Sequence, residues 1–163
     1  MGSRLSAFDT ERLRVAPRAA QLGDPAKRAA LEAALPPLLR EPVLRHLPAG
    51  LQDTADLSAW IATRHANSTV LTAHQGNGLA ALLFVREDPP RYHIGYMLPQ
   101  SHWGKGLASE LLRGLLAALP HPATVSAGVD NANKASARVL LKCGFHERAS
   151  TAPDTRSFEC SLP

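Results

Sequence analysis

Two spacings of hydrophobic residues occur along the chain. In some segments apolar residues recur every three to four positions, as in amphipathic helices, and in others they alternate or form short runs, as in strands. Proline, glycine and asparagine stand between the segments, where turns are expected. The predicted elements, in chain order, are a strand at Thr10–Val15, a helix capped by Asp24 and ended by Pro36, a helix starting at Asp53 or Thr54, strands at Ser68–Ala73, Leu79–Arg86 and Tyr92–Leu98, a helix at Gly104–Leu119, a strand at Ala123–Gly128, a helix from Asn133 to Cys143, and strands at Phe145–Thr151 and Ser157–Leu162.

The middle of the chain predicts an antiparallel meander. Gly76-Asn77-Gly78 is a hairpin signal, and Glu87–Pro90 makes a second turn into the strand Tyr92–Leu98. Helices and strands then alternate, without an internal repeat or a linker-like composition. This order predicts a three-layer α/β or α+β fold in which residues 1–163 form a single domain.

Composition narrows the class of protein. The 163 residues are 45% hydrophobic and 20% charged, which suffices for a core without disulfides or metal and excludes a disordered chain. The 18 Lys and Arg exceed the 14 Asp and Glu by four and are scattered, which indicates a mild preference for anions rather than nucleic-acid binding. Two cysteines form no metal-ligand pattern, and no apolar run approaches the ~18 residues of a membrane span. The sequence therefore predicts a cytoplasmic protein without membrane contact.

The most informative segment is Trp103-Gly104-Lys105-Gly106-Leu107-Ala108, between a strand and a helix. The first N–H groups of a helix have no internal partners and attract phosphate oxygens, and glycines let the backbone approach a ligand. A dinucleotide fingerprint would need a third glycine where Ser109 stands, and a Walker loop is absent. The segment predicts a pyrophosphate site, although neither familiar nucleotide motif is present.

Three motifs in the chain resemble the GNAT superfamily of N-acetyltransferases, in the branch of the ribosomal-protein N-terminal alanine and serine acetyltransferases. The central motif of that branch, I-G-Y-x-[L/I]-x-x-x-x-W-G-[K/R]-G-x-A-x-E, is matched from Ile94 to Glu110. The N-terminal T-E-R-L is matched at Thr10–Leu13. The motif N-x-x-S-x-x-[VL]-x-x-K-x-G-F is matched from Asn133 to Phe145.

The resemblance implies a mostly antiparallel sheet with helices on both faces, in which the family's fourth and fifth strands are parallel and splay apart. Between them the pantetheine arm of acetyl-CoA bonds to backbone like an added strand. The residues it assigns to the cofactor are Tyr96, Met97, Leu98, Trp103, Gly104, Lys105, Gly106, Leu107, Ala108, Asn133 and Ser136. No metal is implied. The basic residues Lys105, Lys134, Arg138 and Lys142 are either phosphate contacts or solvated helix charges.

Acyl transfer needs an oxyanion donor, a proton for the departing thiolate and a neutral amine. By resemblance, backbone N–H groups at Tyr96–Leu98 stabilise the oxyanion and Ser136 supplies the thiolate proton. A tyrosine used elsewhere in the superfamily is replaced by Leu140. His93 and Glu147 are the candidate bases, and a bystander histidine and a solvated acid are the alternatives.

The resemblance predicts an enzyme that transfers an acetyl group from acetyl-CoA to a primary amine by direct attack. The amine belongs to a protein or peptide N-terminus or to a small molecule, and the sequence does not identify it. The alternatives are a catalytically inactive acyl-CoA-binding module and a nucleotide-binding domain of another fold. A monomer and a homodimer are both compatible with the chain.

Overall fold

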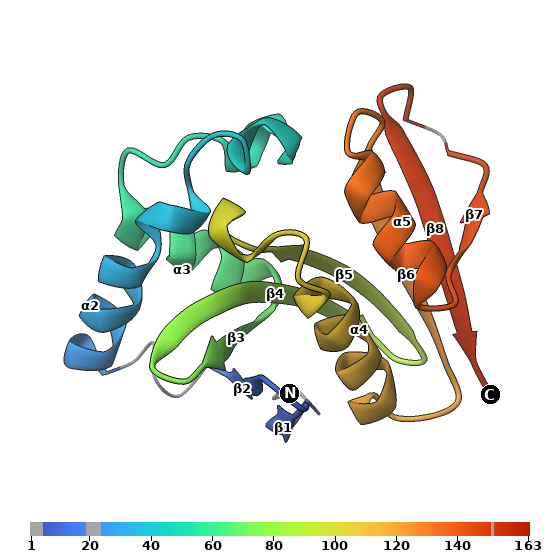
Figure 1. Cartoon of the computed structure of the whole chain (residues 1–163), viewed down its shortest axis with the longest axis horizontal. Helices are drawn as coiled ribbons and strands as arrows, with labels where there is room; N and C mark the ends of the chain where they lie inside the picture. Colours follow the sequence, from blue (N-terminus) through green and yellow to red (C-terminus); the bar gives the residue numbers. More distant parts are fainter. Residues whose placement is uncertain (1–4, 19–23, 151) are drawn as a thin grey trace.

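The computed structural model describes residues 5–18, 24–150 and 152–163. Within them, strands assemble into one mixed sheet with the order β1-β2-β3-β4-β5-β6-β8-β7 (Figure 1). Neighbouring strands are antiparallel except for β5 and β6, which are parallel. The strands are β1 Phe8–Asp9, β2 Arg14–Pro17, β3 Thr69–Gln75, β4 Gly78–Asp88, β5 Arg91–Met97, β6 Ala123–Asp130, β7 His146–Arg148 and β8 Thr155–Leu162.

Helices cover both faces of this sheet. Their bounds are α2 Pro25–Ala34, α3 Leu57–Asn67, α4 Leu107–Ala118 and α5 Lys134–Lys142, with short 3-10 turns η1 Pro36–Leu38, η2 Leu44–His46, η3 Ala49–Leu51 and η4 Gln100–His102. The leucine stripe of α4 and the apolar side of α5 pack on one face with Ile94 and Val125. Trp60 and Ile61 of α3 pack on the other face with Leu82 and Met97. The predicted three-layer arrangement with one parallel pair is confirmed.

Several predicted boundaries were wrong. Thr10–Val15 is not one strand, because Thr10 N–H donates to the Leu13 carbonyl at 2.8 Å and closes a turn between β1 and β2. The helix expected from Asp53 or Thr54 begins at Leu57, because Asp56 is the residue whose carboxylate caps it by accepting from Ala59 N–H.

Two further boundaries also shift. The helix expected from Gly104 begins only at Leu107, since Gly104 and Gly106 have φ of 73° and 76° and cannot extend a right-handed helix. Of the strand expected at Phe145–Thr151, only His146–Arg148 pairs with β8, and Thr151 lies outside the described residues.

The parallel strands β5 and β6 separate before they end. Their pairing runs from Arg91–Thr124 to Ile94–Ala127, and then β5 continues to Met97 and β6 to Asp130 without pairing to each other. Figure 1 shows the two ribbons diverging, with β6, β8, β7 and α5 on one side of the opening and β3–β5 on the other. Backbone groups facing this opening are available to a bound chain. No helix among the described residues is long and apolar enough to cross a bilayer.

Candidate active site

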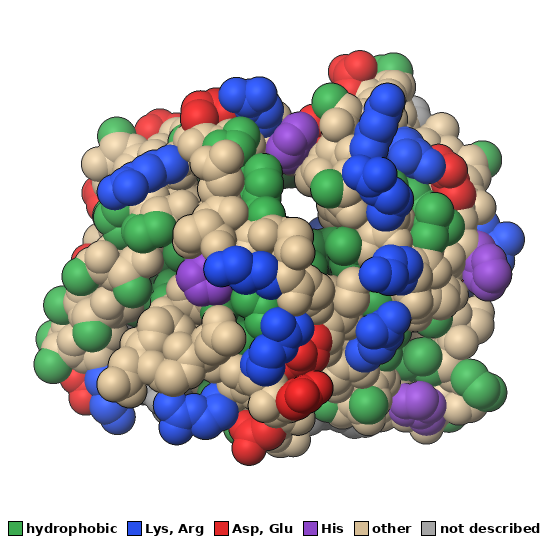
Figure 2. Space-filling view, in the orientation of Figure 1, with side chains coloured by type: hydrophobic (Ala, Val, Ile, Leu, Met, Phe, Trp, Pro, Cys, Tyr) green, Lys and Arg blue, Asp and Glu red, His purple; other side chains and the backbone are tan. Residues whose placement is uncertain are grey.

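A cleft of about 860 Å³ occupies the opening between β5 and β6. The lining residues come from η2, η3, α3, β4 and β5, and also from the loop before α4, the end of β6 and the helix α5. The face in Figure 2 is hollowed between the two halves of the molecule. The cleft therefore brings together segments that are far apart in sequence.

The loop before α4 lines this cleft and ends in a helix N-terminus with unpaired backbone N–H groups. The N-cap of α4 is Gly106, which has no side chain to cap the helix, and the first intrahelical bond runs from Glu110 N–H to the Gly106 carbonyl. The N–H groups of Leu107, Ala108 and Ser109 are consequently free of helical partners. Their dipoles favour an anion at this position. No group of residues that could hold a metal ion occurs in the described part of the chain.

The side chains of Trp103 and Arg12 hydrogen-bond to backbone carbonyls in and before this loop. The Trp103 indole N–H donates to the Leu98 carbonyl at 3.0 Å, although the residue is 42% exposed. The Arg12 guanidinium donates to the Lys105 carbonyl at 3.0 Å and to a Glu110 carboxylate oxygen at 2.8 Å. Two of the motifs recognised in the sequence therefore meet at the loop.

Glu110 is the centre of that contact. Its carboxylate also accepts the Thr10 hydroxyl and the Arg12 backbone N–H. Partial burial opposes the charged form, but these hydrogen bonds outweigh it and hold the pKa of Glu110 below its ordinary value. An ionised Glu110 thus ties the β1–β2 turn to the first turn of α4.

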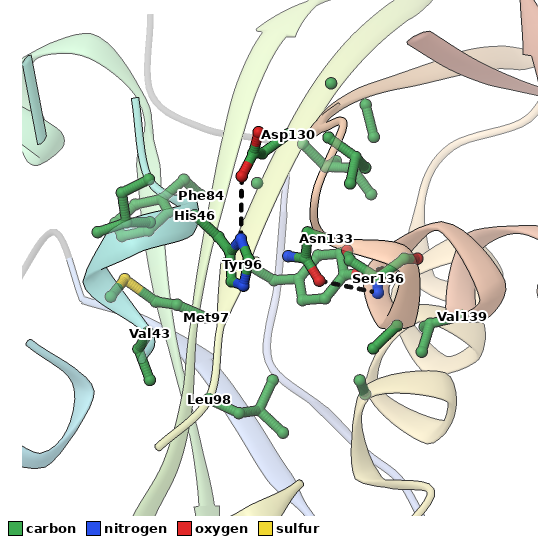
Figure 3. Close-up of a pocket in the computed structure, with 18 of the residues that line it drawn as sticks. Val43, His46, Phe84, Tyr96, Met97, Leu98, Asp130, Asn133, Ser136 and Val139 are labelled. Atoms are coloured by element: carbon green, nitrogen blue, oxygen red, sulfur yellow. Dashed lines mark hydrogen bonds and ion pairs between the residues drawn. The ribbon is translucent and has the colours of Figure 1, made fainter. Parts of the chain in front are cut away.

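Two hydroxyl groups meet inside the cleft. The oxygens of Tyr96 on β5 and Ser136 on α5 are 2.6 Å apart. Asn133 caps α5 by accepting the Ser136 N–H at 3.2 Å, which fixes the serine in place (Figure 3). Burial raises the pKa of Tyr96 to about 12, so this phenol keeps its proton at neutral pH. The pair presents uncharged hydrogen-bond donors where β5 and α5 face each other.

Comparisons with known proteins agree with this geometry. Residues 25–146 match the family model described as an acetyltransferase (GNAT) domain. The chain belongs to the GNAT acetyltransferase family. No curated protein matches it in sequence.

Solved structures with little sequence identity share the fold of this acetyltransferase. RimL, a ribosomal-protein alpha-N-acetyltransferase solved in complex with coenzyme A, is 14% identical with a TM-score of 0.74, over 96% of this chain and 98% of that one. A GNAT-family acetyltransferase from Bacillus anthracis is 18% identical with a TM-score of 0.73, over 95% and 98%. Mycobacterium smegmatis RimJ in complex with a CoA-disulfide is 17% identical with a TM-score of 0.70, over 97% and 88%.

Most of the residues that the sequence assigns to the cofactor line the cleft of this GNAT protein. They are Tyr96, Met97, Leu98, Trp103, Gly104, Gly106, Leu107, Ala108, Asn133 and Ser136. Lys105 does not line it and contributes its carbonyl to the Arg12 contact. Lys134, Arg138 and Lys142 also line the cleft, and Figure 2 shows basic side chains along α5 beside the hollow.

The two candidate bases lie in different surroundings. His93 lines the cleft, and its Nδ1 is 2.9 Å from the Ser126 hydroxyl on β6. Burial, and then the charge of Arg86, lower the pKa of His93, so this imidazole is neutral at pH 7. Glu147 on β7 is outside the cleft lining, and both its carboxylate oxygens accept from Arg156 at 2.9 Å.

Two cleft residues carry a contact that the sequence did not predict. His46 of η2 and Asp130 at the end of β6 form a hydrogen bond of 3.0 Å between Nδ1 and Oδ2 (Figure 3). They are 84 positions apart, and η2 belongs to a proline-rich segment without periodicity. No local sequence pattern therefore links the two residues.

Proposed function

We propose that this protein transfers an acetyl group from acetyl-CoA to a primary amine by direct attack. The observation that carries the proposal is the separation of β5 and β6 above a glycine-built helix N-terminus, with the Tyr96–Ser136 hydroxyl pair between them. Acetyl-CoA, when bound, supplies an activated thioester.

The cleft fits that donor in three places. The free N–H groups of Leu107–Ser109 suit the pyrophosphate, and Gly104 and Gly106 leave its oxygens room to approach. The unpaired edges of β5 after Ile94 and of β6 after Ala127 suit an extended pantetheine arm, which bonds to backbone as an added strand does. A volume of about 860 Å³ is within the range for a cofactor site.

The negative charge that develops on the oxyanion and on the leaving sulfur during acetyl transfer is stabilised by hydrogen-bond donors at fixed positions. A backbone N–H of Tyr96–Leu98 faces the site of the developing oxyanion, since these residues lie where β5 has left β6. Ser136 donates its hydroxyl hydrogen towards the departing sulfur, and Tyr96 holds the serine oxygen. Asn133 keeps Ser136 in the first turn of α5.

The amine must lose a proton as it attacks. An α-amine titrates at about 7.7 to 8.0 and a lysine amine at about 10.4, so an N-terminal or similar amine needs the weaker base. His93 lines the cleft and its pKa is lowered, so it is one candidate for this base. Glu147, paired with Arg156 outside the cleft, is the weaker candidate for this role.

The test is turnover of acetyl-CoA with a panel of peptides and small amines, comparing Ser136→Ala with Cys160→Ser, a substitution at a buried thiol outside the cleft. Ser136→Ala should slow thiol release about 10²-fold or more, because a general acid contributes roughly 10²- to 10⁴-fold, and acetyl-CoA binding should change little. Binding of acetyl-CoA without product from any amine would instead support the inactive module. Stabilisation by ATP or NAD but not by CoA would support a nucleotide-binding protein.

A further inference from the structure

We propose that His46, oriented by Asp130, is the general base that takes the proton from the acceptor amine. This inference rests on the proposed acetyl transfer and adds its missing proton acceptor.

The His46–Asp130 pair bridges two elements that line the cleft. His46 comes from the turn η2 between α2 and α3, and Asp130 is the last residue of β6. Both line the cleft, and their side chains are 20% and 31% exposed, so water and a substrate can still reach them. Figure 3 shows the imidazole standing between its own turn and Asp130, beside the diverging strands.

The hydrogen bond selects the reactive nitrogen. An ionised carboxylate only accepts hydrogen bonds, so Nδ1 of a neutral His46 carries the hydrogen and Nε2 holds the lone pair. The bond from His46 lowers the pKa of Asp130, which keeps its carboxylate charged at neutral pH. This charge then stabilises the imidazolium that forms when Nε2 takes a proton.

The His46–Asp130 pair lies on the side of the sheet that suits a proton acceptor for the amine. Ala127 and Val129 of β6 point into the core beneath α4 and α5, so alternation places Gly128 and Asp130 on the opposite face. Met97 packs on that same face with the α3 side of the molecule. Ser136 lies on α5, so the proton acceptor and the donor to sulfur are on opposite sides of the opening.

His93 is less suited to the same task. Its Nδ1 contacts the Ser126 hydroxyl, and it lies one residue before the last β5–β6 pair, where the strands have not yet separated. Arg86 is its cross-strand neighbour on β4 and opposes a positive charge on the imidazole. His46 instead has the Asp130 carboxylate 3.0 Å from its Nδ1.

The amine nitrogen bonds to the acetyl carbon, the carbon–sulfur bond breaks with its electron pair on sulfur, and one N–H proton moves to Nε2 of His46. The sulfur accepts the Ser136 hydroxyl hydrogen bond and is protonated from that side. Solvent then removes the proton from His46 and restores the one used at Ser136.

Other charged groups share the cleft with this pair. Arg45 neighbours His46 on η2 and is paired with Glu41. The charged and titratable side chains lining the cleft from the remaining elements are Arg64 of α3, Arg86 of β4, His93 and Tyr96 of β5, His102 of η4, and Lys134, Arg138 and Lys142 of the α5 helix. Among these described lining residues, Asp130 is the carboxylate available to an imidazolium.

The test is His46→Asn, because the asparagine amide nitrogen replaces Nδ1 and can keep the bond to Asp130 while removing the base. Turnover should fall about 10²- to 10³-fold, in the range of general-base contributions, with acetyl-CoA affinity within about twofold. The acidic limb of the kcat profile should disappear in this variant. His146→Asn, a change at an exposed histidine on β7, is the matched control and should retain wild-type turnover.

Asp130→Asn tests whether Asp130 orients the imidazole of His46. It should lower kcat at least about 10-fold, because an amide can donate to Nδ1 and favour the wrong tautomer. Nitrogen-15 NMR of the imidazole should show hydrogen on Nδ1 in the wild type and a mixture of tautomers in this variant.

Three results would overturn the inference. Turnover of His46→Asn within about threefold of wild type would remove His46 from the chemistry, and so would a loss of the acidic limb in His93→Gln alone. Hydrogen on Nε2 of wild-type His46 would also contradict it. A wild-type protein that binds acetyl-CoA and acetylates no amine would refute the proposed function itself, which distinguishes the two failures.

Discussion

At the level of single residues, the Tyr96 hydroxyl limits what Ser136 can do. With the pKa of Tyr96 raised to about 12, full proton transfer from this phenol to a thiolate of ordinary pKa near 8.5 would cost ~5 kcal/mol. Tyr96 therefore keeps its proton and holds Ser136 through a hydrogen bond. The sulfur is protonated from the Ser136 side, and solvent restores that proton.

Tyr96→Phe should lower kcat about 10-fold, because removing one partner leaves Ser136 free to turn away from the sulfur. The affinity for acetyl-CoA should change little, since the backbone of β5 is unaltered. Steady-state kinetics with binding by calorimetry checks both. An unchanged kcat would show that the phenol does not position Ser136.

His93 supports a prediction about stability. Because the fold lowers its pKa, the folded protein disfavours the charged imidazole, and the associated stability is present above the unfolded pKa and lost as pH falls. The wild type should therefore lose more stability than His93→Gln between pH 7 and pH 5, measured by urea unfolding. Equal losses in both proteins would contradict the lowered pKa of His93.

At the level of elements, the contact between the β1–β2 turn and α4 explains why two distant motifs occur together. Thr10 and Arg12 reach the Glu110 carboxylate, and Arg12 also reaches the Lys105 carbonyl. The loop that offers its N–H groups to an anion is thereby held from the N-terminal turn. The T-E-R-L motif, expected to form one strand, instead forms this turn.

Glu110→Gln should destabilise the protein by about 1–2 kcal/mol, because it weakens several hydrogen bonds to a charged group that is 17% exposed. It should also raise the acetyl-CoA dissociation constant several-fold by loosening the loop. Glu41→Gln, at a pair with Arg45 in which both side chains are about 60% exposed, should cost under about 0.5 kcal/mol. Equal effects of the two changes in denaturant unfolding would refute the positioning role of Glu110.

Some features of the helices and strands could be predicted from the sequence, and others could not. The parallel pair and the order of helices followed from periodicity and the motif resemblance, and Gly106 predicted a close backbone approach. The N-cap of α3 is Asp56 rather than Asp53 or Thr54, and three such similar capping residues close together leave the start of the helix open in the sequence. The His46–Asp130 contact depends on how η2 folds over β6, which local patterns do not encode.

At the level of the whole molecule, the chain carries a net charge of +4, and several of its basic side chains lie along the cleft. Lys134, Arg138 and Lys142 line it from α5, and Arg64 and Arg86 line it from α3 and β4. Among the described residues of the lining, Asp130 is the carboxylate that opposes them, and it is bonded to His46. The cleft as a whole attracts anions, which fits a phosphate-bearing donor.

Arg138→Gln should weaken acetyl-CoA binding about 2- to 10-fold and reduce its dependence on salt, because a partly screened charge opposite phosphate contributes on that order. Binding of acetyl-pantetheine, which lacks the nucleotide, should be unaffected by this change. Titrations at low and high ionic strength check the expectation. An equal loss for both ligands would place Arg138 away from the phosphates.

The most direct measurement is mass spectrometry of an amine and peptide panel after incubation with isotopically labelled acetyl-CoA and the wild-type protein. We expect label on primary amines, with one free thiol released for each acetyl group transferred, and a rate that falls at least about 10-fold in Ser136→Ala. Thiol release without labelled amine, or tight binding of acetyl-CoA without release, would contradict the account.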